Sequence, residues 1–180
     1  MQTLFFGDRS RRSVLGKFTL REVTPGDYAQ LLPIYNDVVA TSTAIYSEEP
    51  ADGDYIQSYA EGRLAAGFPF IVAVESDGRI AGYGTFGVFR ARPGYRFTVE
   101  HSVHIRSDLR GSGAGSQLMT ALIARARADG YHVMIGAVDG ENEGSLRFHD
   151  RLGFERSARL GEVGRKFDRW LDVVFVTLKL

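Results

Sequence analysis

A glycine-rich stretch in the middle of the chain is the most informative part of the sequence. It reads RGSGAGS, residues 110–116, and it lies between an apolar run at 97–105 and a helical pattern at 116–129. Closely spaced glycines let several backbone N–H groups converge on one anion, and the start of a helix adds the positive end of its dipole. The stretch therefore indicates a phosphate or pyrophosphate site, with a glycine-rich turn that binds nothing as the alternative.

Two common nucleotide-binding motifs do not fit this stretch. It is not a Walker A loop, because no Gly-Lys-Ser/Thr sequence follows. It is a poor dinucleotide fingerprint, because Ser116 stands where the third glycine of that motif belongs, and the loop follows a middle strand rather than the first. A nucleotide-binding protein is therefore the weaker interpretation.

Hydrophobic patterning predicts strands and helices on both sides of the loop. The elements expected before it are a strand at 18–24, a helix opened by Thr24-Pro25, a helix at 51–66 and strands at 69–74, 79–89 and 97–105. The elements expected after it are helices at 116–129 and 142–152 and strands at 131–138, 154–164 and 169–179. Asp77-Gly78 predicts a hairpin, whereas the strand–helix–strand passages favour parallel pairs. The result is an α/β fold with a mixed sheet and helices on both faces.

Length and composition limit the possible functions. The chain has 180 residues, 44% of them hydrophobic, which is typical of one globular domain. It has no cysteine, so a disulfide framework, a thiolate zinc site and a cysteine nucleophile are excluded. Basic and acidic residues number 22 each, so we expect no general affinity for nucleic acid. No apolar run reaches the roughly 18–20 residues that span a bilayer, and no His/Asp/Glu set has metal-ligand spacing.

The first 17 residues are set apart by their charge. They carry four basic side chains against Asp8 alone, and they lack the apolar region of a secretory signal. We expect residues 1–17 to be a poorly packed basic arm or a tag remnant, with a small basic arm that binds a partner as the alternative. Residues 18–180 are then a single domain.

Several stretches carry a family resemblance. The pattern Arg110-x-x-Gly113-x-Gly115, after a strand and before a helix, resembles the acetyl-CoA pyrophosphate loop of GNAT-superfamily N-acetyltransferases. Four further blocks resemble the phosphinothricin and methionine sulfone/sulfoximine N-acetyltransferases: IYN (34–36), TAIY (43–46), TVEHSV (98–103) and GRKFDRWLD (164–172). The resemblance covers residues 18–180. It implies a GNAT-like α/β fold, with a mixed, mostly antiparallel sheet of about seven strands and about four flanking helices.

The resemblance also implies acetyl-CoA as the co-substrate, with no metal. In this family the pantetheine arm runs beside the strand that precedes the glycine loop, the loop holds the pyrophosphate, and an asparagine that opens the next helix contacts the arm. The implied cofactor-binding residues are Val103, His104, Ile105, Arg110, Gly111, Ser112, Gly113, Ala114, Gly115, Ser116 and Asn142.

Glu100 is the best candidate for the general base. A carboxylate on a central strand is costly unless it has a role or a partner, and an amine that attacks a thioester must lose a proton. Strand alternation places Glu100 and Ser102 on one face and His101 on the other, so His101 ranks second as a base. The family pattern implies that His149 either protonates the leaving thiolate or lies near it; packing under the sheet is the structural alternative.

Two arginines before this strand suit an anionic acceptor. A guanidinium group binds carboxylate, phosphinate or sulfoximine oxygens, although a solvated loop is the alternative for Arg90 and Arg92. The implied substrate-binding residues are Arg90, Ala91, Arg92, Glu100, His101 and Ser102. The sequence Phe89-Arg90-Ala91-Arg92 is closer to the phosphinothricin enzymes, whereas His101-Ser102 and the block at 164–172 are closer to the sulfone branch. Both acceptor types stay open.

The resemblance thus implies a homodimeric N-acetyltransferase that uses acetyl-CoA, and we expect it to be cytoplasmic. We expect direct transfer to the α-amino group of a small amino-acid analogue of the phosphinothricin, methionine sulfoximine or methionine sulfone type, with no role for nucleic acid or a membrane. A peptide or protein N-terminal acetyltransferase is the alternative within this class. A CoA-binding regulator without activity is the alternative outside it, and it has no need of Glu100.

Overall fold

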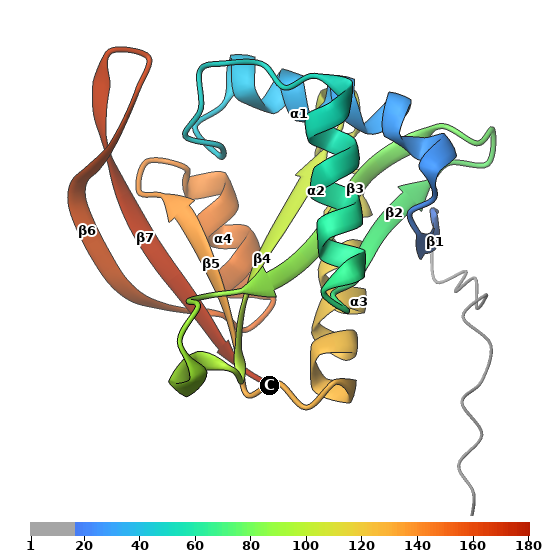
Figure 1. Ribbon diagram of the computed structural model, residues 1–180. Coiled ribbons are helices and arrows are strands. Elements are labelled where there is room, and N and C mark those ends of the chain that lie inside the picture. Colours follow the sequence, from blue (N-terminus) through green and yellow to red (C-terminus); the bar gives the residue numbers. More distant parts are fainter. Residues whose placement is uncertain (1–16) are drawn as a thin grey trace, which may run out of the picture.

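A seven-stranded sheet organises the chain, with the strand order β1-β2-β3-β4-β5-β7-β6 (Figure 1). The computed structural model describes residues 17–180, so the predicted N-terminal arm, except for Lys17, lies outside the described residues. The strands are β1 (Thr19–Glu22), β2 (Phe70–Val74), β3 (Ile80–Val88), β4 (Thr98–Ile105), β5 (Val133–Asp139), β6 (Glu155–Lys166) and β7 (Arg169–Lys179). Every neighbouring pair is antiparallel except β4 and β5, which confirms the predicted mixed, mostly antiparallel sheet.

Helices cover both faces of the sheet, as predicted. Within residues 17–180 the α-helices are α1 (Tyr28–Thr41), α2 (Gly53–Ala65), α3 (Ala114–Ala128) and α4 (Glu143–Arg151). Figure 1 shows α1 and α2 in front of the sheet and α3 and α4 behind it. None of these helices is both long and apolar enough to cross a bilayer.

Strand β3 contributes to the hydrophobic cores on both faces of the sheet, because its side chains are buried on both faces. Tyr83 packs with α1 and α2, whereas Phe86 packs with α3 and the strands behind it. Helix α3 lies so close to the sheet that a Cβ on Gly84 would come within 3.0 Å of Leu122. Each fully buried apolar side chain stabilises this arrangement by about 1.5–3 kcal/mol.

Two helices differ in detail from the sequence prediction. Pro33 lies inside α1, yet the helix is continuous, because its opposite side buries Leu31 and Tyr35 against the sheet. Helix α3 begins at Ala114, two residues earlier than predicted. Gly113 adopts a φ of 97° directly before it, a left-handed conformation that favours glycine and lets the glycine loop turn into the helix.

Lys166 links the connection between α1 and α2 to the β6–β7 hairpin through hydrogen bonds. Its side chain is fully buried, and Nζ donates hydrogen bonds to the carbonyl oxygens of Ser42 and Ile45, at 2.7 Å each. Burial lowers the pKa of Lys166. The Tyr46 ring packs on Gly164 of β6, in the space that a side chain at this position would fill. The connection between α1 and α2 is therefore held over the end of β5 by the last two strands.

Candidate active site

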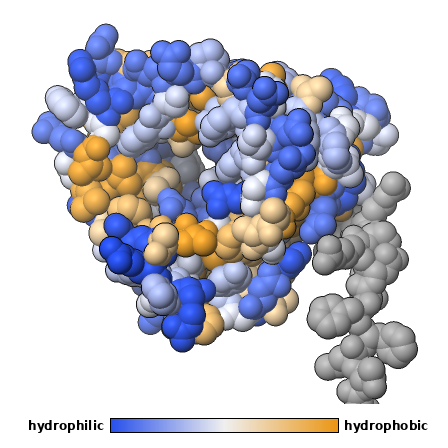
Figure 2. Space-filling model, viewed as in Figure 1, coloured by the Kyte–Doolittle hydropathy of each residue, from blue (hydrophilic) through white to orange (hydrophobic). Residues whose placement is uncertain are grey.

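The candidate active site lies where β4 and β5 separate. The two strands pair over three residues, from Thr98↔Val133 to Glu100↔Ile135, although β4 continues to Ile105. Figure 1 shows them diverging beyond this point, and Figure 2 shows the same face hollowed between α2 and the β6–β7 hairpin. The backbone groups of β4 that face the gap have no strand partner in the described chain. Buried N–H and C=O groups need hydrogen-bond partners, so the gap suits a ligand that supplies them.

The glycine loop lies at the end of β4 that borders this gap. Gly111 and Gly113 have φ values of 79° and 97°, and a Cβ built on either would meet no atom of residues 17–180 within 4 Å. The loop leads into α3, whose first N–H groups have no acceptor within the helix. The open glycines and the helix start, called the anion cradle below, therefore suit the pyrophosphate predicted from the sequence.

The structure brings two predicted cofactor positions together across the gap. Arg110 and Asn142 line one hollow of about 440 Å³, with Asp139 and Thr43 on its wall. Asn142 caps α4, because its Oδ1 accepts a hydrogen bond from the backbone N–H of Ser145 at 3.0 Å. The capping bond leaves the NH₂ group of Asn142 available for a ligand.

Glu100 lies on the face of the sheet covered by α1 and α2. It is opposite Gly87 of β3, and its side chain is half-buried. Burial raises the pKa of Glu100, and the charges of Arg63 and Arg90 partly oppose this effect. A carboxylate whose pKa is raised toward neutrality is a better proton acceptor at physiological pH than an exposed one.

His101 lies on the opposite face and is paired with His149 of α4. The Nδ1 of His149 lies 2.8 Å from the carbonyl oxygen of Ser145, and the two Nε2 atoms are 3.2 Å apart. A carbonyl only accepts, so His149 Nδ1 carries the hydrogen and His149 Nε2 accepts from His101. The remaining nitrogen, Nδ1 of His101, is buried and has no partner among residues 17–180.

Burial favours the neutral form of both histidines. Burial, with a smaller contribution from the neighbouring His149, lowers the pKa of His101 to about 3. Burial also lowers the pKa of His149. His101 was predicted to bind substrate and ranked second as a base, but its ring points away from Glu100 and packs over Gly136, where a Cβ would come within 2.6 Å of its Nε2. The placement expected from strand alternation is confirmed, and it separates His101 from the acceptor side.

The other predicted acceptor residues lie in or beside the exposed turn after β3. Arg90, Ala91 and Arg92 are exposed, and the guanidinium carbon of Arg90 lies 5.2 Å from the Phe89 ring centre. The charge of Arg90 acts on Glu100. Ser102 shares the face of Glu100 and is partly buried. Among these acceptor residues, the structure thus links the charge of Arg90 to Glu100.

Sequence reasoning missed Arg63 and Tyr59, both on α2. The guanidinium of Arg63 lies 5.4 Å from the Tyr59 ring centre and packs against Gly87. A glycine inside an apolar strand often marks a close approach by another group. Gly87 was therefore a signal for such a contact, although it did not identify the residue that makes it.

Comparison with known proteins identifies the family and the fold. The acetyltransferase (GNAT) family profile matches residues 32–154. The chain belongs to this family. It is 45% identical over 162 residues, 90% of this chain and 94% of the relative, to an L-methionine sulfoximine/L-methionine sulfone acetyltransferase of Pseudomonas paraeruginosa. It is 38% identical to a phosphinothricin N-acetyltransferase of Alcaligenes faecalis, over 88% of this chain and 80% of the relative. This GNAT protein is accordingly an acetyl-transferring enzyme, as the sequence predicted.

A solved structure agrees with this assignment. The structure of a GNAT superfamily phosphinothricin acetyltransferase from Sinorhizobium meliloti, in complex with acetyl-CoA, has a TM-score of 0.88 to this chain at 32% identity. The match covers 91% of this chain and 89% of that one. The predicted GNAT-like fold is confirmed.

The buried histidine pair predicts how stability depends on pH. The unfolded chain protonates His101 near its ordinary pKa of 6.5, but the folded chain does so only near 3. The unfolded state therefore binds more protons between these values, and the free energy of unfolding falls as the pH drops below about 6.5. His101 alone is expected to remove about 2 kcal/mol between pH 7 and pH 5.

Urea unfolding of the wild type and His101→Gln at pH 7 and pH 5 tests this expectation. Glutamine cannot titrate in this range and retains a donor for His149, so the variant is expected to lose less stability on acidification. Equal losses in the two proteins would show that His101 does not resist protonation in the folded state.

Proposed function

We propose that this enzyme transfers an acetyl group from acetyl-CoA to the α-amino group of a small amino-acid analogue such as methionine sulfoximine, methionine sulfone or phosphinothricin. The proposal rests on one observation above the others: a half-buried carboxylate, Glu100, lies where β4 parts from β5 and within the field of Arg63 and Arg90. The names of the relatives supply the acceptor class, and the Sinorhizobium meliloti complex supports acetyl-CoA as the donor.

The residues of this chain divide the reaction between the two sides of the sheet. Acetyl-CoA supplies the acetyl thioester; the anion cradle at Gly111–Gly113 would hold its pyrophosphate, and free backbone N–H groups of β4 would polarise the thioester carbonyl. Glu100 takes a proton from the acceptor amine, whose nitrogen forms the new bond to the carbonyl carbon. The C–S bond breaks, and the electron pair leaves on sulfur. Fixing both reactants in one site supplies much of the rate.

The role of His149 as the proton donor to the leaving thiolate stays a prediction. Its Nε2 accepts a hydrogen bond from His101, so the proton available on His149 is on Nδ1, which is bound to the Ser145 carbonyl oxygen. This residue can give a proton to the thiolate only if the hydrogen bond from its Nδ1–H group to the Ser145 carbonyl oxygen breaks. Water is the alternative donor.

Glu100→Gln is expected to separate chemistry from binding. The amide retains the shape of the side chain but cannot take a proton, so kcat should fall by about 10²- to 10⁴-fold. The acid limb of the pH–rate profile should flatten, because the group that titrates there is lost. Steady-state kinetics across pH 5–9, with either acceptor type, measure both effects. A variant that retains full kcat would mean that another group is the base.

Gly113→Asp is expected to abolish acetyl-CoA binding. The φ of 97° strains any side chain at this position, and the carboxylate places a negative charge in the anion cradle. Gly130→Asp, at the other end of α3, is a matched control, because Gly130 also has a positive φ of 80° and open space around it. Calorimetry should detect binding to the control and none to Gly113→Asp. Normal binding to Gly113→Asp would refute the assignment of the loop.

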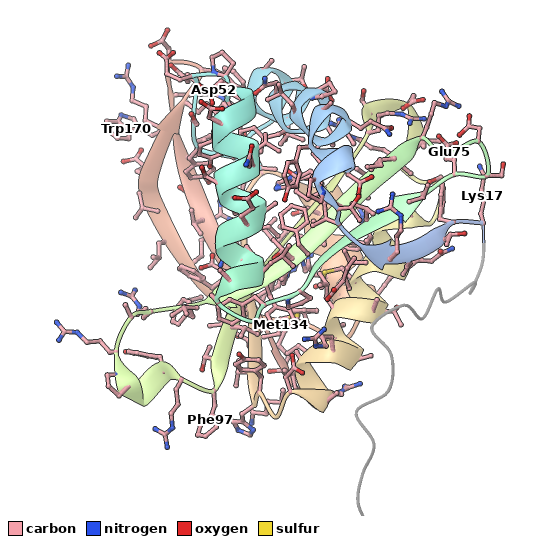
Figure 3. The ribbon with its side chains drawn as sticks, turned by 45° about the vertical axis from the view of Figure 1, so that its right-hand side comes forward. Lys17, Asp52, Glu75, Phe97, Met134 and Trp170 are labelled. Carbon is pink, nitrogen blue, oxygen red and sulfur yellow. The ribbon has the colours of Figure 1, made fainter. Side chains whose placement is uncertain are left out.

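We also propose that the protein is a homodimer formed through the β6–β7 hairpin. Exposed apolar side chains gather on this hairpin, and Figure 3 shows Trp170 on its outer side. They are Leu160, Val163, Phe167 and Trp170, with 44–63% of each exposed. Strand β6 is an edge strand, and an open edge with apolar neighbours favours association.

Light scattering is expected to give twice the 19.9 kDa mass of one chain for the wild type. Trp170→Glu should shift the population toward the monomer, because a charge in an apolar interface is costly. Tyr95→Glu is the control, since Tyr95 is also exposed but lies far along the chain in the β3–β4 connection. A wild type that is monomeric at micromolar concentration would rule the dimer out.

A further inference from the structure

The guanidinium of Arg63 fills a space over the main chain of β3 that the absence of a side chain at Gly87 leaves open. Its guanidinium packs against Gly87, and a Cβ at that position would collide with Nη1. The Tyr59 ring supports the group from the side of α2. Gly87 is the register partner of Glu100, so the guanidinium lies beside the proposed base.

Among residues 17–180, Arg63 forms no salt bridge to a carboxylate. The salt bridges within residues 17–180 join other side chains, and the arginine nearest in sequence, Arg79, is paired with Glu75 and Asp77. Arg63 is partly buried, and Glu100 feels its charge without forming a salt bridge to it. A partly buried guanidinium without a carboxylate favours an anionic ligand, because such a ligand supplies the missing hydrogen bonds.

The negative charge of Glu100 and the positive charge of Arg63 match the amino and carboxylate groups of an α-amino acid. The amino nitrogen and the carboxylate carbon of such a molecule are bonded to the same carbon, so the groups that receive them must also lie close together. Glu100 suits the amino group, and Arg63 is the cation that lies beside it. The exposed Arg90 and Arg92 are then left for oxyanions farther along the acceptor side chain.

We propose that Arg63 binds the α-carboxylate of the acceptor and thereby selects free amino acids over peptides and simple amines. The inference rests on the proposed function and adds a specificity-determining residue to it. In a peptide the first residue carries an amide in place of the carboxylate. A neutral amide leaves the Arg63 charge without a partner, and such mismatches are strongly disfavoured.

The test compares methionine sulfoximine with its α-carboxamide. The wild type should prefer the free acid, and Arg63→Met should raise the KM for the acid by roughly 10- to 150-fold, the range expected for a lost charged hydrogen bond. The KM for acetyl-CoA and the kcat/KM for the carboxamide should change little. Arg63→Lys should recover part of the preference. Arg127→Met, which removes an exposed arginine of α3 outside the site, should retain it.

A second variant tests the same inference without removing the charge. Gly87→Ala places a Cβ where Nη1 lies, so it should displace the guanidinium and reduce the preference for the free acid as well. If Arg63→Met and Gly87→Ala slow the acid and the carboxamide equally, Arg63 does not bind the carboxylate and the inference is wrong, while the proposed function stands. If the wild type binds acetyl-CoA but acetylates neither compound nor any other amino-acid analogue, the proposed function itself fails.

Discussion

The short pairing between β4 and β5 is the constraint on which the rest of the site depends. Neighbouring parallel strands normally form hydrogen bonds between their backbone N–H and C=O groups along their length, but these two separate after Glu100 and Ile135. On the α4 side of the sheet, the His101 ring lies over Gly136 of β5 at this point and is hydrogen-bonded to His149. The backbone of β4 beyond Glu100 is exposed to a ligand, while both strands remain anchored in the sheet by β3 and β7.

The same separation assigns different tasks to the two faces. Alternation along β4 turns Glu100 toward α2 and His101 toward α4, so neighbouring residues occupy environments that shift their pKa values in opposite directions. Burial favours the uncharged form in both cases. The pKa of the Glu100 carboxyl group is moved toward neutral pH, so the group can exchange a proton. The His101 imidazole stays neutral and packs between β5 and α4.

The sequence was sufficient for features that depend on local pattern. Strand alternation separated Glu100 from His101, and the glycine spacing located the turn between β4 and α3 together with the helix that follows it. Arg63 could not be found in this way. Tyr59 and Arg63 form an i, i+4 row beside the buried residues Ile56 and Ala60, but which strand such a row meets depends on how the helix is seated on the sheet. The contact between His101 and His149, 48 residues apart, likewise depends on tertiary packing.

The hydrogen bonds from Lys166 to the α1–α2 connection bear on the order in which parts of the structure form during synthesis. The connection at residues 42–52 emerges early in synthesis, but its anchor is 124 residues downstream of Ser42. Strand β5 also waits for β7, which pairs with it from Val133 to Asp139. The first half of the chain can form a hydrophobic layer of β1, β2, β3 and the first two helices while it is still being translated. The wall of the site forms only when the last two strands dock, so a nascent chain cut before residue 166 would lack it.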